Sequence, residues 1–474
     1  MQLISVKILI DFWEKLTPIT KKLCLFTVFN IILVNLIVLI VIFPPHRYDT
    51  VLVSPHRYET VKLPPHRYKT ALFHTFNFLR IHQKVDSWKP MEEAFNYLQS
   101  KQQKPLYYEI FFNKKTKFQY PVTSLLIFSI LKTIIPLNTS WSGILGVISW
   151  IFVIIMIVFV IEIFNLSLKG DSGDFPDCSS KSELIIRAVL IVTLVLTFYP
   201  VVKAYTLGQI QVWINSLFTI LFWCWMKEKK EVAGIIAGII CLLKPQYTII
   251  LLWSILRKQW VFVSTFITTI LIGLLTSILV FGFINNINYL RVLSYIAKHG
   301  ESFYPNQSVN GLLNRLLFNG NNLEWIEHSF PPFHPWVYFG TLSSSLVLIS
   351  IALLRPKKQY ERGNIIDFSI ISITCTMASP VAWEHHYGIL LPIYAFVFPY
   401  LLKQESCGKA LVLLCTSYFL SSNYFPATNK LAYTPFNFVQ SYLFIAGLML
   451  LGYLYFSRDG EVIRKMNTVT DNHP

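Results

Sequence analysis

The sequence is poor in charged residues and rich in apolar ones. Only 14% of its 474 residues are Asp, Glu, Lys or Arg, whereas 54% are hydrophobic. Soluble domains carry nearer to a quarter of charged residues. The shortage of charge therefore excludes an ordinary soluble domain and indicates that most of the chain contacts lipid.

Several sequence signals of other protein classes are missing. The seven cysteines show neither paired spacing nor metal-ligand spacing, so we expect no disulfide framework, no metal site and no cofactor. A glycine-rich loop of the Walker or Rossmann type is absent, which argues against a soluble nucleotide donor. The net charge of +16 forms no nucleic-acid motif, and we expect no nucleic-acid partner. The cysteines are Cys24, Cys178, Cys224, Cys241, Cys375, Cys407 and Cys415.

Apolar runs long enough to cross a bilayer recur from Leu23 to Phe456. A span needs about 20 largely apolar residues, and the runs predict an all-α polytopic membrane protein with about twelve transmembrane helices. The lysines before Leu23, without a cleavage site, favour a cytoplasmic N-terminus over 1–22 and a retained first helix over 23–43. We further expect an outer loop over 44–140, a transmembrane core over 141–456 and a cytoplasmic tail over 457–474.

The outer loop opens with a tandem decapeptide over residues 45–74, in the copies PHRYDTVLVS, PHRYETVKLP and PHRYKTALFH. One interpretation is a cationic comb for anionic lipid heads or phosphate. We favour a duplicated surface insertion, because the position after each HRY holds Asp49, Glu59 and Lys69 in turn. A catalytic position would not tolerate that exchange.

The segment 121–136 decides on which side all later loops lie. It is short for a span and contains Lys132, so we predict a helix at the outer interface, with a short span as the alternative. With the first choice, the short basic clusters fall on the cytoplasmic side, as the positive-inside rule requires. Farther on, Lys244-Pro245 interrupts an apolar run and predicts two short helices that meet at the outer side.

This topology gathers polar groups from five separate segments on the outer face. Each has a simpler explanation alone: Gln209 could cross-link helices, Lys244 could anchor at the interface, and Asn306 and Gln307 could be turn residues. Together they predict an active site at the outer rim of the membrane, with 84–136 as the catalytic segment. The groups are Asp86 with Trp88, Gly208-Gln209, Lys244-Pro245, Asn306-Gln307-Ser308 through Arg315, and Trp383-Glu384-His385-His386.

The residue types at this rim indicate phosphate chemistry. Lys244, Arg315, His385 and His386 are donors suited to phosphate, and a nearby carboxylate can act as general base. Adjacent histidines point about 100° apart on a helix, and no third ligand has metal-site spacing, so metal binding is the weaker interpretation. The set predicts transfer from a phosphorylated, membrane-embedded donor to a hydroxyl.

Four pieces of the chain carry a family resemblance: GQIQVWINSLF, AGIIAGIICLLKPQYTIILL, NQSVNGLLNRLL and SPVAWEHHYGILLP. In this order they resemble the polyprenol-phosphate-mannose-dependent mannosyltransferases of glycosyltransferase family 87, in the C-type superfamily. The resemblance implies inverting hexosyl transfer, with mannose as the first candidate, from a polyprenyl-phosphate sugar to a lipid-linked or surface acceptor. It places the reaction on the outer face of the plasma membrane.

The resemblance also implies residue roles. It assigns the base to Asp86, places Lys244, Arg315, His385 and His386 near the donor phosphate, and leaves Gln209, Asn306 and Gln307 as substrate-binding candidates. The decapeptides separate Asp86 from the first helix, unlike the family pattern, so Asp49 and Glu92 are alternative bases. The rival functions are a flippase or transporter of lipid-linked saccharides, which would need internal repeats and midplane sites, and an oligosaccharide polymerase or ligase.

Overall fold

The protein is a bundle of membrane-length and shorter helices in the computed structural model, which describes residues 13–42, 48–54, 57–62, 71–79, 84–100, 104–134, 141–169, 180–355, 361–403 and 408–470. The predicted cytoplasmic residues 1–12, the proline heads of the three decapeptides, Cys178 and Cys407 lie outside these ranges. Cys24, Cys224, Cys241, Cys375 and Cys415 are free thiols.

By length and composition, five helices of the described part could cross a membrane, or six if the bent pair α7 (Lys181–Thr197) and α8 (Tyr199–Leu207) is one span. The fold is therefore that of an all-α membrane protein, but the predicted count of about twelve spans is not supported. Several apolar runs form helices of fewer than 18 residues, too short for a bilayer core about 30 Å thick. The five spans are Trp141–Lys169, Trp260–Phe281, Pro335–Leu354, Glu384–Lys403 and Asn437–Ser457.

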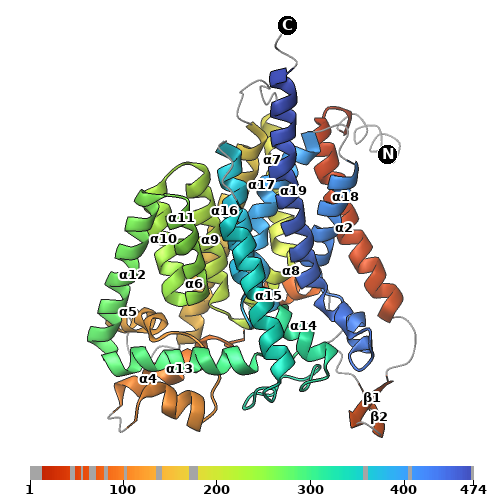
Figure 1. Ribbon diagram of the computed structural model, residues 1–474. Coiled ribbons are helices and arrows are strands. Elements are labelled where there is room, and N and C mark those ends of the chain that lie inside the picture. The colour runs from red at the N-terminus through yellow and green to blue at the C-terminus, as the bar shows by residue number, and fades with distance from the viewer. Residues whose placement is uncertain are drawn as a thin grey trace.

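Figure 1 shows how the elements are arranged in space. The first half of the chain holds α2 (Pro18–Ile42), β1 (Tyr48–Ser54), β2 (Arg57–Lys62), α3 (Ala71–Leu79), α4 (Trp88–Gln99), η2 (Tyr108–Asn113), η3 (Val122–Leu125), α5 (Leu126–Ile134), α6 (Trp141–Lys169), α7, α8 and α9 (Gln211–Met226). The second half holds α10 (Lys230–Leu243), η4 (Pro245–Tyr247), α11 (Thr248–Leu256), α12 (Trp260–Phe281), α13 (Phe283–His299), α14 (Val309–Leu316), α15 (Pro335–Leu354), α16 (Glu361–Met377), η5 (Glu384–Ile389), α17 (Leu390–Lys403), α18 (Gly408–Ser422), η6 (Pro426–Leu431), η7 (Asn437–Ser441) and α19 (Tyr442–Thr470).

Two predicted interruptions can be compared with these elements. The break at Lys244-Pro245 is confirmed: α10 ends at Leu243, Lys244 is extended, and η4 and α11 follow. Residues Val122–Ile134 form one of the shorter apolar helices rather than a helix of membrane-spanning length. This helix is thus shorter than the roughly 20 residues that a span needs, and its place at the outer interface stays a prediction.

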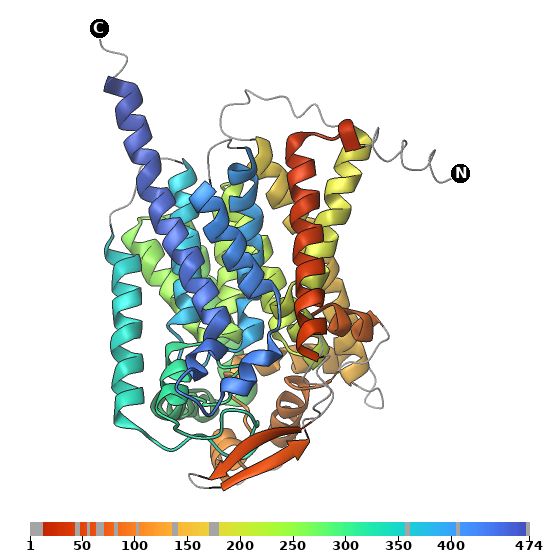
Figure 2. The same cartoon turned by 90° about the vertical axis from the view of Figure 1, so that its right-hand side faces the viewer.

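The two ends of the bundle differ in the elements that they carry. In Figures 1 and 2, α4, α13, α14 and the β hairpin lie at the lower end, and α13 runs across the helix bundle rather than along it. The beginning of α2 and the far end of α19 lie at the upper end. The hairpin and α4 therefore share one end of the bundle with α13 and α14, opposite the beginning of α2 and the far end of α19.

The first two decapeptides pair with each other as an antiparallel hairpin. Strand β1 faces β2 with Thr50 opposite Thr60 and Val51 opposite Glu59. Figure 1 shows this hairpin apart from α4 at the lower end. A small two-stranded sheet thus accompanies the helices, and the described copies pair locally instead of building a solenoid.

Close helix packing on the α10 side depends on small residues. Gly234 and Gly238 lie one turn apart on α10, and a Cβ on Gly234 would come within 2.5 Å of the Phe262 carbonyl oxygen of α12. A Cβ on Gly238 would come within 2.6 Å of Thr269. This spacing of small residues lets two membrane helices approach closely, and it fixes the helix that ends at Lys244.

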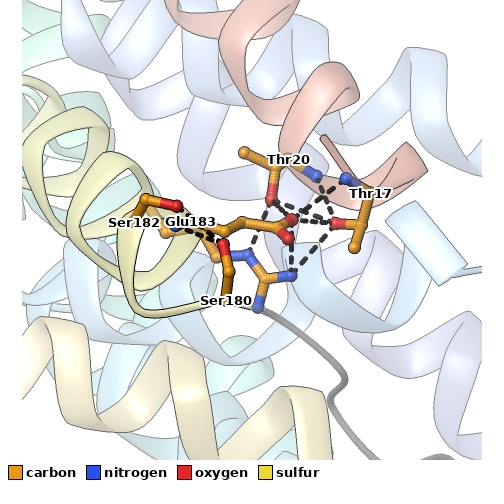
Figure 3. A network of polar contacts seen from close by, with 6 residues as sticks. Thr17, Thr20, Ser180, Ser182 and Glu183 are labelled. Atoms are coloured by element: carbon orange, nitrogen blue, oxygen red, sulfur yellow. Dashed lines mark hydrogen bonds and ion pairs between the residues drawn. The ribbon is translucent and has the colours of Figure 1, made fainter. Parts of the chain in front are cut away.

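A buried polar network joins α2 to α7 at the upper end (Figure 3). The Glu183 carboxylate accepts from the Thr17 amide at 3.1 Å and pairs with Arg187 at 3.1 Å. The Arg187 guanidinium also donates to the Thr20 hydroxyl at 2.7 Å. Ser180 caps α7 by accepting from the Glu183 amide, as N-cap serines commonly do. These contacts hold the first helix against the bundle.

Candidate functional site

Asp86 is held by backbone contacts with the end of α8. The Asp86 amide donates to the Leu207 carbonyl at 2.9 Å, and the Ser87 amide donates to the Gly208 carbonyl at 3.3 Å. Gly208 has a φ of +66°, and a Cβ there would lie 1.7 Å from the Lys84 carbonyl oxygen. Only glycine fits both the left-handed backbone and this close approach. The Gly208-Gln209 pair thus fixes the catalytic candidate.

Gln209 orients the Asp86 side chain. The Gln209 amide nitrogen donates to the Asp86 carboxylate, while the Gln209 carbonyl oxygen accepts from the Ser87 and Tyr120 hydroxyls. The Ser87 hydroxyl in turn accepts from the Ile210 amide at 3.2 Å. Because both hydroxyls engage the carbonyl side, the amide group must face Asp86. The carboxylate therefore keeps one orientation and retains lone pairs for another donor.

The environment of Asp86 shifts the pKa of its carboxyl group upward. Asp86 is exposed, yet desolvation by the surrounding protein raises its pKa above the ordinary range. The Gln209 hydrogen bond and the charges of Lys203 and Lys84 oppose this rise, and Glu327 adds to it. An accessible carboxylate with a raised pKa is a typical feature of functional sites.

A second cluster surrounds Lys244. Its ammonium group donates to the Gln211 side-chain oxygen at 2.6 Å and contacts the His386 Nε2 at 2.5 Å. No carboxylate of the described residues lies within ion-pair distance of Lys244, and the buried His386 Nδ1 lacks a hydrogen-bond partner there. A buried cation without a carboxylate partner is costly unless an anion approaches.

The start of α9 connects the two clusters. Gln209 contacts Asp86, whereas Gln211 contacts Lys244 and donates to the Asn215 side chain at 2.8 Å. Asn215 donates to the His385 carbonyl at 3.3 Å. A Cβ on Gly388 would lie 2.0 Å from the Asn215 amide nitrogen, so a larger residue there would displace the Asn215 side chain. One short motif thus positions groups from the first loop, the α10 break and η5.

Asn306 and Gln307 bind the loop before α14 to the segment before η5. The Asn306 side chain accepts from the Ala382 amide at 3.0 Å and donates to the Glu301 carbonyl at 2.8 Å. The Gln307 side chain donates to the Gln440 carbonyl at 2.8 Å and accepts from the Phe444 amide at 3.2 Å. Backbone groups thus occupy both amides, which hold the loop in place.

Arg315 is buried and binds the same loop before α14. Its guanidinium donates to the Tyr304 carbonyl at 3.3 Å, the Asn306 carbonyl at 3.0 Å and the Ser441 hydroxyl at 2.6 Å. Only 1% of its surface is exposed. Glu384, also buried, accepts from Tyr199 at 2.9 Å. Both charges are enclosed by protein groups in this structure.

The structure therefore gathers most of the predicted residues but gives them different surroundings. Asp86, Gln209, Lys244, His385 and His386 are linked through α9. Asn306, Gln307 and Arg315 form the adjoining support. Glu92 lies in α4, and no contact of the described residues joins its side chain to the Gln209 cluster. Asp49 lies in β1.

Sequence reasoning missed Lys203 of α8. It lies one turn before Thr206 and Leu207, whose carbonyls hold Lys84 and Asp86, and its ammonium lies 6.0 Å from the Tyr199 ring centroid. It is partly accessible, and no ion pair joins it to a described residue. The signal was present, because Lys203 is a lone charge in the apolar helix directly before Gly208-Gln209.

A comparison with family models matches residues 118–380 to the model described as glycosyltransferase family 87. Comparisons with curated proteins and with solved structures each found no match. The matched region includes Gln209, Lys244, Asn306, Gln307 and Arg315, and it begins after Asp86 and ends before η5.

Proposed function

Because the chain belongs to glycosyltransferase family 87, we propose that it transfers a hexose from a polyprenyl-phosphate sugar to a hydroxyl of a lipid-linked or surface glycan acceptor. Mannose is the first candidate for the sugar. The reaction takes place at the bundle end that carries Asp86, which we assign to the outer face of the plasma membrane because the short basic clusters then lie inside. Several apolar helices and the family together make the chain a membrane glycosyltransferase.

The observation that carries the mechanism is the accessible, oriented carboxylate of Asp86. Gln209 and its hydroxyl partners hold this carboxylate in one orientation. In the proposed step the acceptor oxygen attacks C1 of the sugar and its proton passes to Asp86. The bond between C1 and the phosphate oxygen breaks, and its electron pair leaves with the phosphate. Attack opposite the leaving group inverts the anomeric centre.

The developing charge on the leaving phosphate needs cations that are already in place. We assign Lys203 to this role beside Asp86, because it is partly accessible and makes no ion pair with a described residue. Lys244 and His386 form a second, more buried donor pair, with His385 directly beside them. An arriving phosphate would supply the anion that Lys244 lacks.

Arg315, Asn306 and Gln307 support the proposal as positioning residues. Arg315 donates to the Asn306 carbonyl, and the Asn306 side chain accepts from the Ala382 amide. The Gln307 side chain donates to the Gln440 carbonyl. Precise placement of reacting groups contributes strongly to rate, and a shift of about 1 Å is already costly. We therefore expect these residues to act through the loop that they hold rather than through direct phosphate contact.

The decisive experiment is the substitution Asp86→Asn in purified protein. The amide keeps the shape but cannot accept a proton, so we expect sugar transfer to fall by about 10²- to 10⁴-fold, with donor binding and expression retained. The assay follows labelled hexose from a synthetic polyprenyl-phosphate hexose into acceptor.

Glu92→Gln is the matched control, because Glu92 lies in the following helix and is the alternative base. It should transfer sugar at nearly the wild-type rate. Normal turnover by Asp86→Asn together with loss of transfer in Glu92→Gln would identify Glu92 in α4 as the base. If the wild type transfers no sugar from any polyprenyl-phosphate hexose, the proposed donor class is wrong.

A further inference from the structure

The segment between α14 and α15 forms a loop with fixed ends and an exposed tip. At one end the Tyr304 amide donates to the Asn322 carbonyl at 2.8 Å, and the Asn322 side chain donates to Gln440 at 2.7 Å. At the other end the Asn319 side chain donates to the Pro332 carbonyl at 3.0 Å. Between them every residue of Glu324–Ser329 is exposed. The rest of the loop thus holds a short solvent-facing tip in place.

Trp325 in this tip is exposed but firmly supported. The Lys117 ammonium lies 3.6 Å from its ring centroid, and Lys117 forms a 2.8 Å ion pair with Glu301 in which both side chains are 6% exposed. The Trp383 ring meets it nearly edge to face, with centroids 5.3 Å apart. Trp325 itself is 40% exposed. The Phe303 ring also lies 6.0 Å from it, centroid to centroid, so the exposed part of the indole is what Lys117, Trp383 and Phe303 leave open.

The supported indole lies beside the candidate site. Trp383 directly precedes η5, which carries Glu384, His385 and His386, and its backbone bridges to Asn306. Glu327, two residues after Trp325, lies near enough to Asp86 for its charge to act on that carboxylate. The tip is therefore joined to the start of η5 through the Trp325–Trp383 contact, and the charge of Glu327 acts on the Asp86 carboxylate.

We propose that the tip Glu324–Ser329 binds the acceptor, with Trp325 stacked against a sugar ring and the Glu327 carboxylate accepting hydrogen bonds from sugar hydroxyls. This assignment rests on the proposed function, since it names the element that presents the acceptor to Asp86. An aromatic face matches the apolar C–H face of a pyranose, and a carboxylate is a strong acceptor for hydroxyls. The fixed loop ends reduce the ordering that binding requires.

The chemistry of the tip favours a glycan over lipid headgroups as its occupant. Glu324 and Glu327 place two carboxylates beside Trp325. An anionic bilayer surface repels such a pair, whereas interfacial anchors combine aromatic residues with lysine or arginine. A neutral polyhydroxyl ligand meets no such repulsion.

The test compares two acceptors that share an alkyl chain but differ in the head group: octyl mannoside and octyl glycerol. In Trp325→Ala we expect kcat/KM for octyl mannoside to fall by about tenfold, the equivalent of about 1.4 kcal/mol, with little change for octyl glycerol and for the donor KM. Trp325→Tyr should restore much of the loss. Trp336→Ala is the matched control, because Trp336 is 76% exposed at the start of α15. This substitution should leave kcat/KM unchanged for both acceptors.

Direct binding of octyl mannoside without donor, measured by calorimetry, separates this inference from the proposed function. If binding weakens in Trp325→Ala but not in Trp336→Ala, this result supports glycoside binding by the tip, even if the wild type transfers no sugar from the polyprenyl donor. Equal losses for both acceptors would show that Trp325 only stabilises the fold. Unchanged kcat/KM and binding in Trp325→Ala, or no glycoside binding by the wild type, would overturn the inference.

Discussion

Charges of both signs surround Asp86, and they act on its pKa in opposite directions. Desolvation by the surrounding protein raises the pKa of the carboxyl group, and Glu327 raises it further. The Gln209 hydrogen bond and the charges of Lys203 and Lys84 lower it. A general base must be ionised, so transfer should be lost as the pH falls through this pKa. The acid limb of the pH profile of kcat/KM then reports the environment of Asp86.

Two single substitutions should move that limb in opposite directions. Glu327→Gln removes a negative charge, which lowers the pKa of Asp86 and shifts the acid limb to lower pH. Lys203→Ala removes a positive charge, which raises the pKa and shifts the limb to higher pH. The measurement is kcat/KM for labelled transfer across pH 4 to 9. Shifts of the same sign, or none, would contradict Asp86 as the titrating base.

Alanine substitutions of Lys203 and Arg315 should have different effects on the melting temperature. Arg315→Ala leaves two buried carbonyls and a hydroxyl without their donor, and we expect a loss of about 3 kcal/mol or more, seen as a melting temperature lower by roughly 5 °C. Lys203→Ala should leave the melting temperature nearly unchanged and raise the donor KM. Thermal unfolding in detergent and donor titration test both. An unaltered melting temperature with a raised donor KM in Arg315→Ala would instead place Arg315 on the phosphate.

At the scale of elements, the close packing of α10 against α12 positions Lys244 of the candidate site. The Lys244 cluster begins where α10 ends, and α10 is fixed against α12 through Gly234 and Gly238. Any added side chain at Gly234 meets a backbone oxygen, which cannot rotate away. The two helices would have to separate, and Lys244 would move with them.

Gly234→Ala should therefore destabilise the protein and reduce transfer, although alanine is the better helix former by about 1 kcal/mol. Gly452→Ala is the matched control, because Gly452 lies in α19 and a Cβ there meets nothing within 4 Å. That substitution should be neutral or stabilising. Melting temperatures of the two variants in the same detergent decide the matter. Equal effects would show that helix propensity, and not close packing, dominates at Gly234.

At the scale of the whole molecule, α4, which begins two residues after Asp86, lies with α13 and α14 at one end of the bundle, opposite the beginning of α2 and the far end of α19. We expect the end with α13 and α14 to face outward and Lys229 to face the cytoplasm. In a variant without native cysteines, Lys298→Cys should react with an impermeant thiol reagent in intact cells, and Lys229→Cys only after permeabilisation. Both residues are exposed, so access depends on the side alone. The reverse pattern would invert the proposed orientation.

Much of the helical framework could be predicted because hydrophobic length is a local property of the chain. The long apolar runs predict membrane-length helices such as α12 and α15, and Lys244-Pro245 predicts the break after α10. The predicted count of about twelve spans is not supported, because it too was based on local hydrophobicity alone. An apolar run shows that a segment is buried, but helices such as α9 and α11 are shorter than a span and pack among others.

The sequence by itself determined the membrane class, the long helices, the break at Lys244 and the family. Only the tertiary structure decided which polar groups remain available. Arg315 and Asp86 both read as site residues in the sequence, yet Arg315 is enclosed by backbone carbonyls whereas Asp86 stays accessible and meets Lys203, Gln209 and Glu327. Hydrophobicity and helix propensity act between neighbours in the chain. Hydrogen-bond partners and electric fields act between neighbours in space, and here more than a hundred residues separate Asp86 from each of these three partners along the chain.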